Sequence, residues 1–257
     1  MRQLVTIQAV WMAAAVVLGV TCIRAQQNAP AAAAQTPKTA RSSAPIDLTG
    51  YWVSLVTEDW RWRMVTPPKG DYASIPITQA AKERADTWDP SKDEAAGEQC
   101  KSYGAPALMR VPGRVHIVWE NDNTLKVETD AGMQIRLLHF GDWKPSGGMP
   151  TWQGDSSAKW ETPRAPVAGG GQFGTLKVVT DHLRPGYLRK NGVPYSDKAL
   201  LTEYWELFKE QNGDQWLVIT TQVEDPVYLQ GPWVVGLHFK REPTGAKWDP
   251  TPCSSRW

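Results

Sequence analysis

The sequence lacks most of the residues and motifs that identify a common enzyme class. Its 257 residues include only 4 histidines, 3 cysteines and 4 phenylalanines. It contains no Gly-x-Ser-x-Gly elbow, no phosphate loop, no His-Glu-x-x-His and no dinucleotide-binding fingerprint. These absences argue against the enzyme classes that depend on those motifs, and we expect no cofactor.

An excess of charge of one sign is also missing. The chain has 28 Lys and Arg against 27 Asp and Glu, a formal net charge of +1. Affinity for nucleic acid needs a clustered excess of basic residues, so we expect no nucleic-acid partner. Beyond the first 25 residues, no stretch is apolar enough to cross a membrane, so we expect no stable span in the mature chain.

The first 25 residues are predicted to be a signal peptide. Arg2 supplies positive charge, residues 10–20 are almost purely apolar, and Ala25 is a small residue at a cleavage point. A membrane anchor is the alternative, although the apolar run is short for a bilayer. A lipoprotein on Cys22 is disfavoured by the residues before it. We therefore expect a periplasmic or secreted protein.

Residues 26–45 are rich in Ala, Gln, Pro and Ser without a hydrophobic period, and are predicted to be a disordered linker. The folded domain is expected at 46–257. Only Cys100 and Cys253 remain after cleavage, and an even pair in an oxidising compartment predicts one disulfide. A metal site held by the two thiolates is the weaker alternative, because neither cysteine has a second Cys or a His at metal-binding spacing.

Alternation with period two dominates the folded part. One segment, Thr78–Thr87, is predicted to be a helix, because Thr78 can cap it and Ala, Lys, Glu and Arg follow. About nine or ten strands with short turns favour a closed up-and-down antiparallel barrel over a sandwich, because closure removes exposed edges. The expected strands are 48–56, 60–65, 114–120, 124–129, 133–140, 151–161, 176–181, 199–208, 215–223 and 233–241.

The segment Gly50-Tyr51-Trp52 resembles the Gly-x-Trp start of lipocalin-like (calycin) barrels. In that family a basic residue near the end of the last strand covers the Trp, and Lys240 and Arg241 stand at about that place. The resemblance implies a lipocalin-like barrel, and together with the strand pattern we expect an all-β, antiparallel up-and-down barrel of about 8–10 strands with one short helix.

A broader resemblance spans most of the folded part. The chain is similar to a group of uncharacterised secreted bacterial proteins with a Cys-led loop, Pro-Thr-Trp-x-Gly (150–154) and Lys-Trp-Glu (159–161). This resemblance implies a fold and no reaction. Many members have His where this chain has Asp155, and most lack the Gly-rich insert at 168–171.

Strand parity selects two candidate catalytic residues, because alternate side chains point to opposite faces. His139 shares a face with Met133, Ile135 and Leu137, which predicts that it points inward and that Arg136 points outward. Glu203 shares a face with Leu201, Trp205 and Leu207. A carboxyl group there needs a partner or a raised pKa. An acid/base pair is one interpretation; a structural histidine and a salt bridge from Glu203 to an internal Arg is the other.

The remaining polar candidates are secondary. By parity His116, Glu120 and His238 face solvent, whereas His182 ends a strand beside Asp181, where a barrel mouth is expected. Asp155 completes this group because of its place after the Trp-x-Gly motif. A metal site is the further alternative: His116 and Glu120 are too far apart along a strand to share an ion, and no spacing recommends a site built on His139 and Glu203.

Tryptophan is the abundant residue, with 14 Trp against 7 Tyr and 4 Phe. Trp concentrates in cores, interfaces and ligand cavities. Several Trp lie on expected inward stripes near small residues, which favours an aromatic-lined cavity over a solid core. The parity of 215–223 is undecided. The expected ligand-binding residues are Trp60, Trp62, Trp152, Ser156, Trp160, Trp205, Thr220 and Gln222.

Two function classes remain. One is a cofactor-free lyase or isomerase that uses His139 and Glu203 as an acid/base pair on a small apolar or aromatic molecule. The other is a periplasmic lipocalin-like binding protein with the same cavity and no chemistry. A metal-dependent enzyme using cavity histidines is the second alternative.

Overall fold

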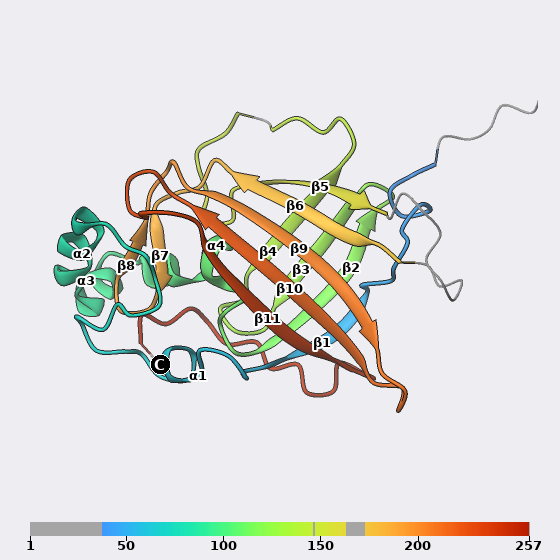
Figure 1. The fold of residues 1–257 in the computed structure, drawn as a ribbon, viewed down its shortest axis with the longest axis horizontal. Coiled ribbons are helices and arrows are strands. Elements are labelled where there is room, and N and C mark those ends of the chain that lie inside the picture. Colours follow the sequence, from blue (N-terminus) through green and yellow to red (C-terminus); the bar gives the residue numbers. More distant parts are fainter. Residues whose placement is uncertain (1–37, 146, 163–172, 257) are drawn as a thin grey trace, which may run out of the picture. The chain divides into compact units, whose positions relative to one another are not determined.

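The computed structural model describes residues 38–145, 147–162 and 173–256. Nine strands close into a barrel in the order β1-β11-β10-β9-β6-β5-β4-β3-β2 (Figure 1). The predicted all-β barrel is confirmed. Its strands are β1 Gly50–Leu55, β2 Arg114–Asn121, β3 Thr124–Thr129, β4 Ile135–Phe140, β5 Asp155–Glu161, β6 Thr175–Asp181, β9 Leu200–Lys209, β10 Gln215–Glu224 and β11 Trp233–Glu242.

The barrel is antiparallel except at one pair. β4 and β5 run parallel, with His139 opposite Ser157. β6 pairs directly with β9, because β7 Gly186–Arg189 and β8 Val193–Tyr195 form a separate two-stranded hairpin. The sequence pattern did not predict this hairpin.

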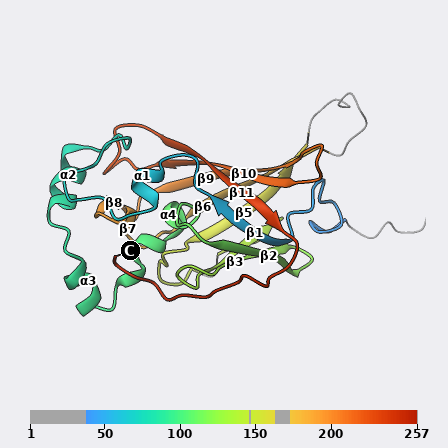
Figure 2. The same ribbon diagram turned by 90° about the horizontal axis from the view of Figure 1, so that it is seen from below.

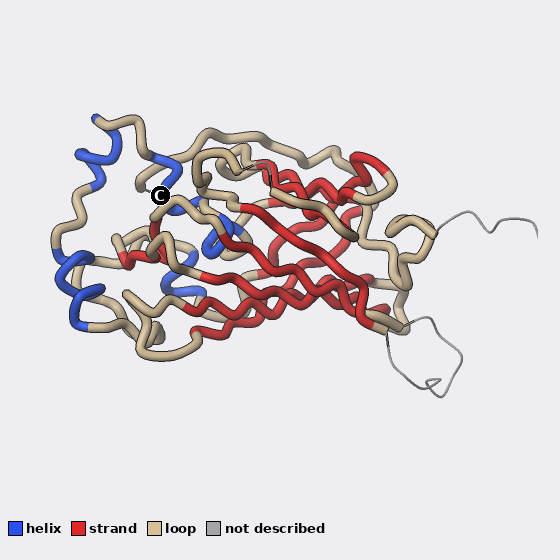
Figure 3. The backbone as a smooth tube through the Cα atoms, turned by 90° about the horizontal axis from the view of Figure 1, so that it is seen from above, coloured by secondary structure: helices blue, strands red, loops and turns tan. Residues whose placement is uncertain are grey.

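Short helices and the β7–β8 hairpin lie at one end of the barrel (Figures 1 and 3). The predicted helix is α2, whose capping residue Thr78 accepts a hydrogen bond from the Ala81 backbone at 3.2 Å. The prediction of a single helix is wrong, because the segments on both sides of α2 are also partly helical. The helices are α1 Trp60–Arg63, α2 Gln79–Asp86, α3 Pro90–Ala95, the 3-10 helix η1 Gln99–Tyr103 and α4 Ala105–Leu108.

The prediction of a strand at 60–65 is wrong. Its Trp-Arg-Trp-Arg alternation looks like strand, but Asp59 adopts a left-handed backbone conformation, with φ of 51°, and turns the chain into α1. Trp60 is therefore 66% exposed, whereas Arg63 is buried. One turn of helix here puts a charged residue inside and an aromatic residue outside.

The barrel interior is a packed core of apolar side chains. Trp52, Trp205 and Phe239 are at most 1% exposed and belong to one cluster with the inward residues of the other strands. Trp52 is held at the start of β1, where its Nε1 donates to the Leu48 carbonyl at 2.9 Å. The guanidinium of its cross-strand partner Arg241 lies 5.4 Å from its ring centroid.

Beyond β11 the chain returns along the barrel to the end that bears the helices (Figure 2). There Cys253 forms the predicted disulfide with Cys100 of η1, across a separation of 153 residues. Within the described residues, no helix is both long and apolar enough to span a bilayer.

The predicted signal peptide, the first part of the expected linker and the Gly-rich insert lie outside the described residues. The last residues of the expected linker contact the barrel. The backbone amides of Ala40 and Arg41 donate to Asn123 and Asp122 in the β2–β3 turn.

Candidate functional site

The predicted acid/base pair is not assembled. Glu203 points into the barrel and is fully buried, but His139 points outward. The inner face of β4 carries Arg136, Leu138 and Phe140, so the inward assignment of His139 and the outward assignment of Arg136 were wrong. Both faces of β4 carry apolar residues, and Ile135 and Leu137 are 53% and 40% exposed. Parity alone therefore could not choose the correct face.

Glu203 forms a buried ion pair with Arg136. Arg136 Nη1 and Nη2 donate to the two carboxylate oxygens at 3.1 and 2.6 Å, and both side chains are 0% exposed. Arg136 Nη2 also donates to Thr180 Oγ1 at 3.2 Å, and that hydroxyl lies 2.7 Å from Ser156 Oγ. The structure therefore confirms the alternative interpretation of Glu203, a salt bridge to an internal arginine.

His139 lies on the outer wall. Its ring stacks on Trp143 with centroids 4.0 Å apart, and Nδ1 lies 3.3 Å from Thr124 Oγ1. Burial lowers the pKa of His139, and the nearby Asp155 opposes that shift. The barrel wall separates His139 from Glu203, so the two side chains cannot act on one substrate atom.

The expected tryptophan-lined cavity is also not formed by the residues chosen for it. Trp60 and Trp62 belong to α1, and Trp152 precedes β5, so these three do not line the barrel interior. Thr220 and Gln222 lie on the outer face of β10, because Leu217, Ile219 and Val223 take the inner face. Ser156 and Trp205 do point into the barrel, but both are buried by packed neighbouring side chains. Trp160 is partly buried and packs against the core.

Of the secondary candidates, Asp155 and His182 contact each other, whereas His116 and Glu120 do not form a pair. His182, which follows β6, places Nδ1 2.8 Å from Asp155 Oδ2. His116 places Nδ1 2.9 Å from Glu128 Oε2 and stacks on Tyr51, while Glu120 is exposed at the end of β2. Among the described residues, no three His, Cys, Asp or Glu side chains are grouped as metal ligands.

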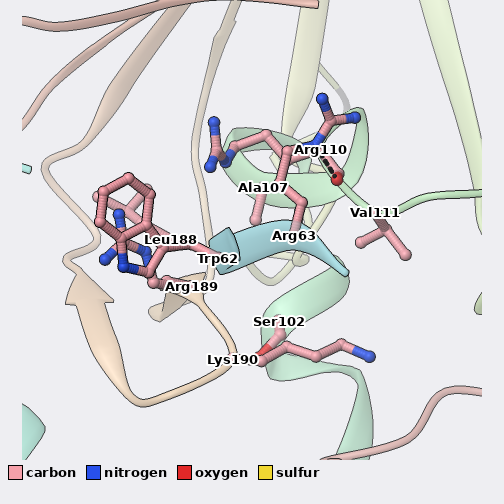
Figure 4. Close-up of a pocket in the computed structure, with 9 residues that line it drawn as sticks. All are labelled: Trp62, Arg63, Ser102, Ala107, Arg110, Val111, Leu188, Arg189 and Lys190. Atoms are coloured by element: carbon pink, nitrogen blue, oxygen red, sulfur yellow. Dashed lines mark hydrogen bonds between the residues drawn. The ribbon is translucent and has the colours of Figure 1, made fainter. Parts of the chain in front are cut away.

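The strongest concentration of unusual groups lies at the end of the barrel that bears the helices. Three arginines line one pocket there, and Arg63, Arg110 and Arg189 are only 2%, 6% and 4% exposed. Arginine is rarely buried without a partner, because removing its charge from water is costly. Burial lowers the pKa of all three, and the charge of Arg110 lowers those of the other two further. The Arg110 guanidinium therefore lies within electrostatic reach of both Arg63 and Arg189 (Figure 4).

Every side-chain nitrogen of Arg63 donates to a protein acceptor. Its Nε donates to the Arg110 carbonyl at 2.9 Å, its Nη2 to Ser54 Oγ at 3.1 Å, and its Nη1 to Glu58. The Arg63 side chain thus fixes the Arg110 backbone and positions the pocket. Each of its three side-chain nitrogens already has a protein acceptor.

Arg110 and Arg189 each keep an unused donor. Arg110 pairs with Asp59 at 3.1 Å through Nη1, but its buried Nη2 has no acceptor among the described residues. Arg189 donates through its two terminal nitrogens to the Asp71 and Ala73 carbonyls and to Ser74 Oγ, and its buried Nε has no acceptor there. A buried donor without an acceptor costs about 1–3 kcal/mol.

The charges around the pocket do not balance. Glu58 and Asp59 offset Arg63 and Arg110, and the Asp71 carboxylate binds Arg61 at 2.8 Å. The hydrogen-bond acceptors of Arg189 within the described chain are neutral oxygens. Burial lowers the pKa of Arg189 to about 10, which leaves it cationic at neutral pH.

Aromatic rings hold the two arginines that have spare donors. The guanidinium carbon of Arg189 lies 4.9 Å from the Trp62 ring centroid, and that of Arg110 lies 4.9 Å from the Trp233 ring centroid. Such stacking fixes the plane of a guanidinium without using its N–H groups. Ala107, Val111 and Leu188 complete the walls, and the cavity of about 30 Å³ holds only a few atoms.

Among the residues that line this pocket, the sequence pattern predicted a ligand-binding role only for Trp62, and it placed Trp62 inside the barrel. Arg63, Arg110 and Arg189 come from three segments separated by tens of residues, and no motif joins them. The local signal at Arg189 is turn-like, because Lys190-Asn191-Gly192 follows it. Only the folded chain brings the three arginines together.

No protein-family model, no curated protein and no solved structure matches this chain.

Proposed function

We propose that this protein binds a small oxyanion, such as a short carboxylate, in the pocket of Arg63, Arg110 and Arg189. The observation that carries the proposal is the pair of buried, unused donors on Arg110 and Arg189. Two N–H groups from neighbouring arginines match the oxygens of one anion, and charge-assisted hydrogen bonds are about twice as strong as neutral ones. A bound anion also offsets the excess positive charge.

The proposed occupant is small because the cavity is small. About 30 Å³ suits a carboxylate head or an inorganic oxyanion, whereas typical sites for larger organic ligands measure about 300–1,000 Å³. The rings of Trp62 and Trp233 hold the guanidinium planes in place before binding. A preorganised site loses little conformational entropy when its ligand arrives.

We further propose that the barrel is lipocalin-like and that the protein works outside the cytoplasm. The position of Arg241 over Trp52 supports the first point, and the Cys100–Cys253 disulfide supports the second. The ligand site differs from the cavity expected from the sequence, because none of the pocket-lining residues comes from a barrel strand.

Binding is the stronger proposal than catalysis. The expected lyase or isomerase needs His139 and Glu203 in one cavity, and these side chains lie on opposite sides of the wall. Glu203 already has Arg136 as its partner. The residues of the arginine pocket include three arginines and Lys190 and no carboxylate or histidine, so they are suited to holding negative charge.

Isothermal titration with acetate, phosphate and sulfate tests the proposal. The native protein should bind at least one of these anions, and Arg189→Gln should weaken that binding by about tenfold or more. Arg189→Lys should recover part of the affinity, because it restores the charge without the forked donors. Arg256→Gln, which removes an exposed arginine elsewhere, should bind as the native protein does.

Thermal unfolding of each variant keeps the result interpretable. If Arg189→Gln does not fold, Arg110→Gln replaces it, since Arg110 supplies the other spare donor. The proposal fails if none of the three anions binds the native protein, or if a folded Arg189 or Arg110 variant binds as tightly as the native protein.

A further inference from the structure

A second feature of the end that bears the helices is an aromatic groove between α2, α3, η1 and β7. It consists of two cavities of about 300 and 420 Å³ that share Arg84, Lys101 and Tyr187. Tyr228, Pro185 and Pro194 line the first cavity, and Trp88 lines the second. Each cavity is within the size range of sites for small organic ligands.

The carboxylates near this groove already have partners. Asp93 accepts from Lys101 Nζ at 2.8 Å and from Tyr187 Oη at 3.0 Å. Glu98 pairs with Lys101 and Arg184, and Asp89 accepts from Ser91. These acids are therefore engaged in holding the walls.

The unengaged polar groups are mainly donors. Within the described part of the chain, the side chains of Arg84 and Lys92, the indole N–H of Trp88 and the hydroxyl of Tyr228 have no hydrogen-bond or ion-pair partner. Arg84 is exposed on α2 and acts electrostatically on Tyr187, so its charge lies close to the groove. A ligand with acceptor oxygens, at least one of them negatively charged, is complementary to these donors.

The walls select the rest of the ligand. The ring of Tyr187 is fixed by its hydrogen bond to Asp93 and by Lys101, whose Nζ lies 5.6 Å from the ring centroid. Tyr228, Trp88 and two prolines add flat apolar surface. Planar rings stack well on such surfaces.

From this combination we infer that the groove is a second binding site, for a planar aromatic carboxylate whose ring lies against Tyr187 and whose carboxylate pairs with Arg84. The site is separate from the arginine pocket. In β7, Gly186 and Tyr187 line the groove, whereas Leu188 and Arg189 line the pocket. The neighbouring η1 residues Lys101 and Ser102 divide between the groove and the pocket in the same order. This inference does not depend on the proposed oxyanion site.

Isothermal titration with benzoate, acetate and benzyl alcohol tests the groove. Benzoate has both the ring and the charge, acetate has only the charge, and benzyl alcohol has the ring without the charge. Benzoate should bind the native protein at least tenfold more tightly than benzyl alcohol. Arg84→Gln should remove most of that advantage. Tyr187→Leu should also lower the affinity for benzoate, because it removes the face on which the ring stacks.

Matched variants identify the site. Lys82→Gln removes another exposed cation from α2, outside the groove, and should leave benzoate binding unchanged. Arg189→Gln should weaken the binding of acetate and leave the binding of benzoate unaffected. Failure of one proposed site is therefore distinguishable from failure of the other.

The inference is overturned if benzoate binds no better than benzyl alcohol. It is also overturned if Arg84→Gln and native protein bind benzoate equally, or if Arg189→Gln abolishes benzoate binding, which would assign benzoate to the arginine pocket. Arg84 is exposed on α2, so its replacement is compatible with folding; thermal unfolding of each variant verifies this.

Discussion

Arg136 Nη2 donates to Glu203 Oε2 at 2.6 Å inside the barrel, where both side chains are inaccessible to solvent. The pair joins β4 to β9 across the interior, strands that are not neighbours in the sheet. Thr180 and Ser156, from β6 and β5, extend the contact into a polar network. Through Arg136, Glu203 therefore holds β9 in a fixed position relative to β4, β5 and β6.

Replacement of Glu203 by Gln should destabilise the fold. The change removes the negative charge and leaves Arg136 buried without a counterion, at a cost of about 3–5 kcal/mol. Urea unfolding measures this loss, and Glu224→Gln, at the exposed end of β10, is the control that should change stability little. The double variant Arg136→Met/Glu203→Leu should recover most of the loss, because a packed apolar pair avoids the desolvation cost. A single variant as stable as the native protein would contradict this role.

Lys190 should make the free energy of unfolding increase with pH in the alkaline range. Burial lowers its pKa from an ordinary 10.5 to about 8. Between those two values the unfolded chain keeps a proton that the folded chain has lost, so stability rises with pH by up to about 3 kcal/mol across that interval. Urea midpoints from pH 7 to 10.5 measure the slope.

The Lys190→Met variant should lack this part of the slope, whereas Lys82→Met, at an exposed position on α2, should keep it. Comparison of variants cancels the contributions of other groups that titrate in the same range. Identical slopes for the native protein and Lys190→Met would show that Lys190 is not desolvated as the structure implies.

The disulfide should account for a large part of the stability. Cys100 and Cys253 close a loop with a separation of 153 residues, for which chain entropy gives an upper value of about 5 kcal/mol. The Cys100→Ser/Cys253→Ser variant should therefore unfold at lower urea concentration than the oxidised protein and close to the reduced one. Equal midpoints for the oxidised protein and the double variant would mean that the C-terminal segment holds to the barrel without the bond.

Local patterns predicted the barrel because most strands have one buried and one polar face. At 124–129 and 215–223, the strand pattern and the turn residues at the ends set the limits of the strands to within about one residue, although the inward face of 215–223 was undecided. Thr78 likewise predicted the start of α2, since capping depends on neighbouring residues only. These features need no information from distant parts of the chain.

The site could not be predicted in the same way. Arg136 looks like an outward residue until Glu203 is placed opposite it across the barrel. Arg63 looks like the polar face of a strand until Glu58 and Ser54 are seen to bind it. In each case a partner distant in space reverses the assignment made from local pattern. The buried position of Arg189 depends on carbonyl groups more than 100 residues away.

The most direct test of anion binding is crystallography with selenate, an oxyanion that scatters anomalously. Crystals grown without sulfate or phosphate and soaked in millimolar selenate should show an anomalous selenium peak in the pocket, placed so that the selenate oxygens lie within hydrogen-bond distance of Arg110 Nη2 and Arg189 Nε. The same soak of Arg189→Gln crystals should show no peak there. Native crystals whose pocket stays free of selenate, while acetate and phosphate also fail to bind in solution, would contradict the account.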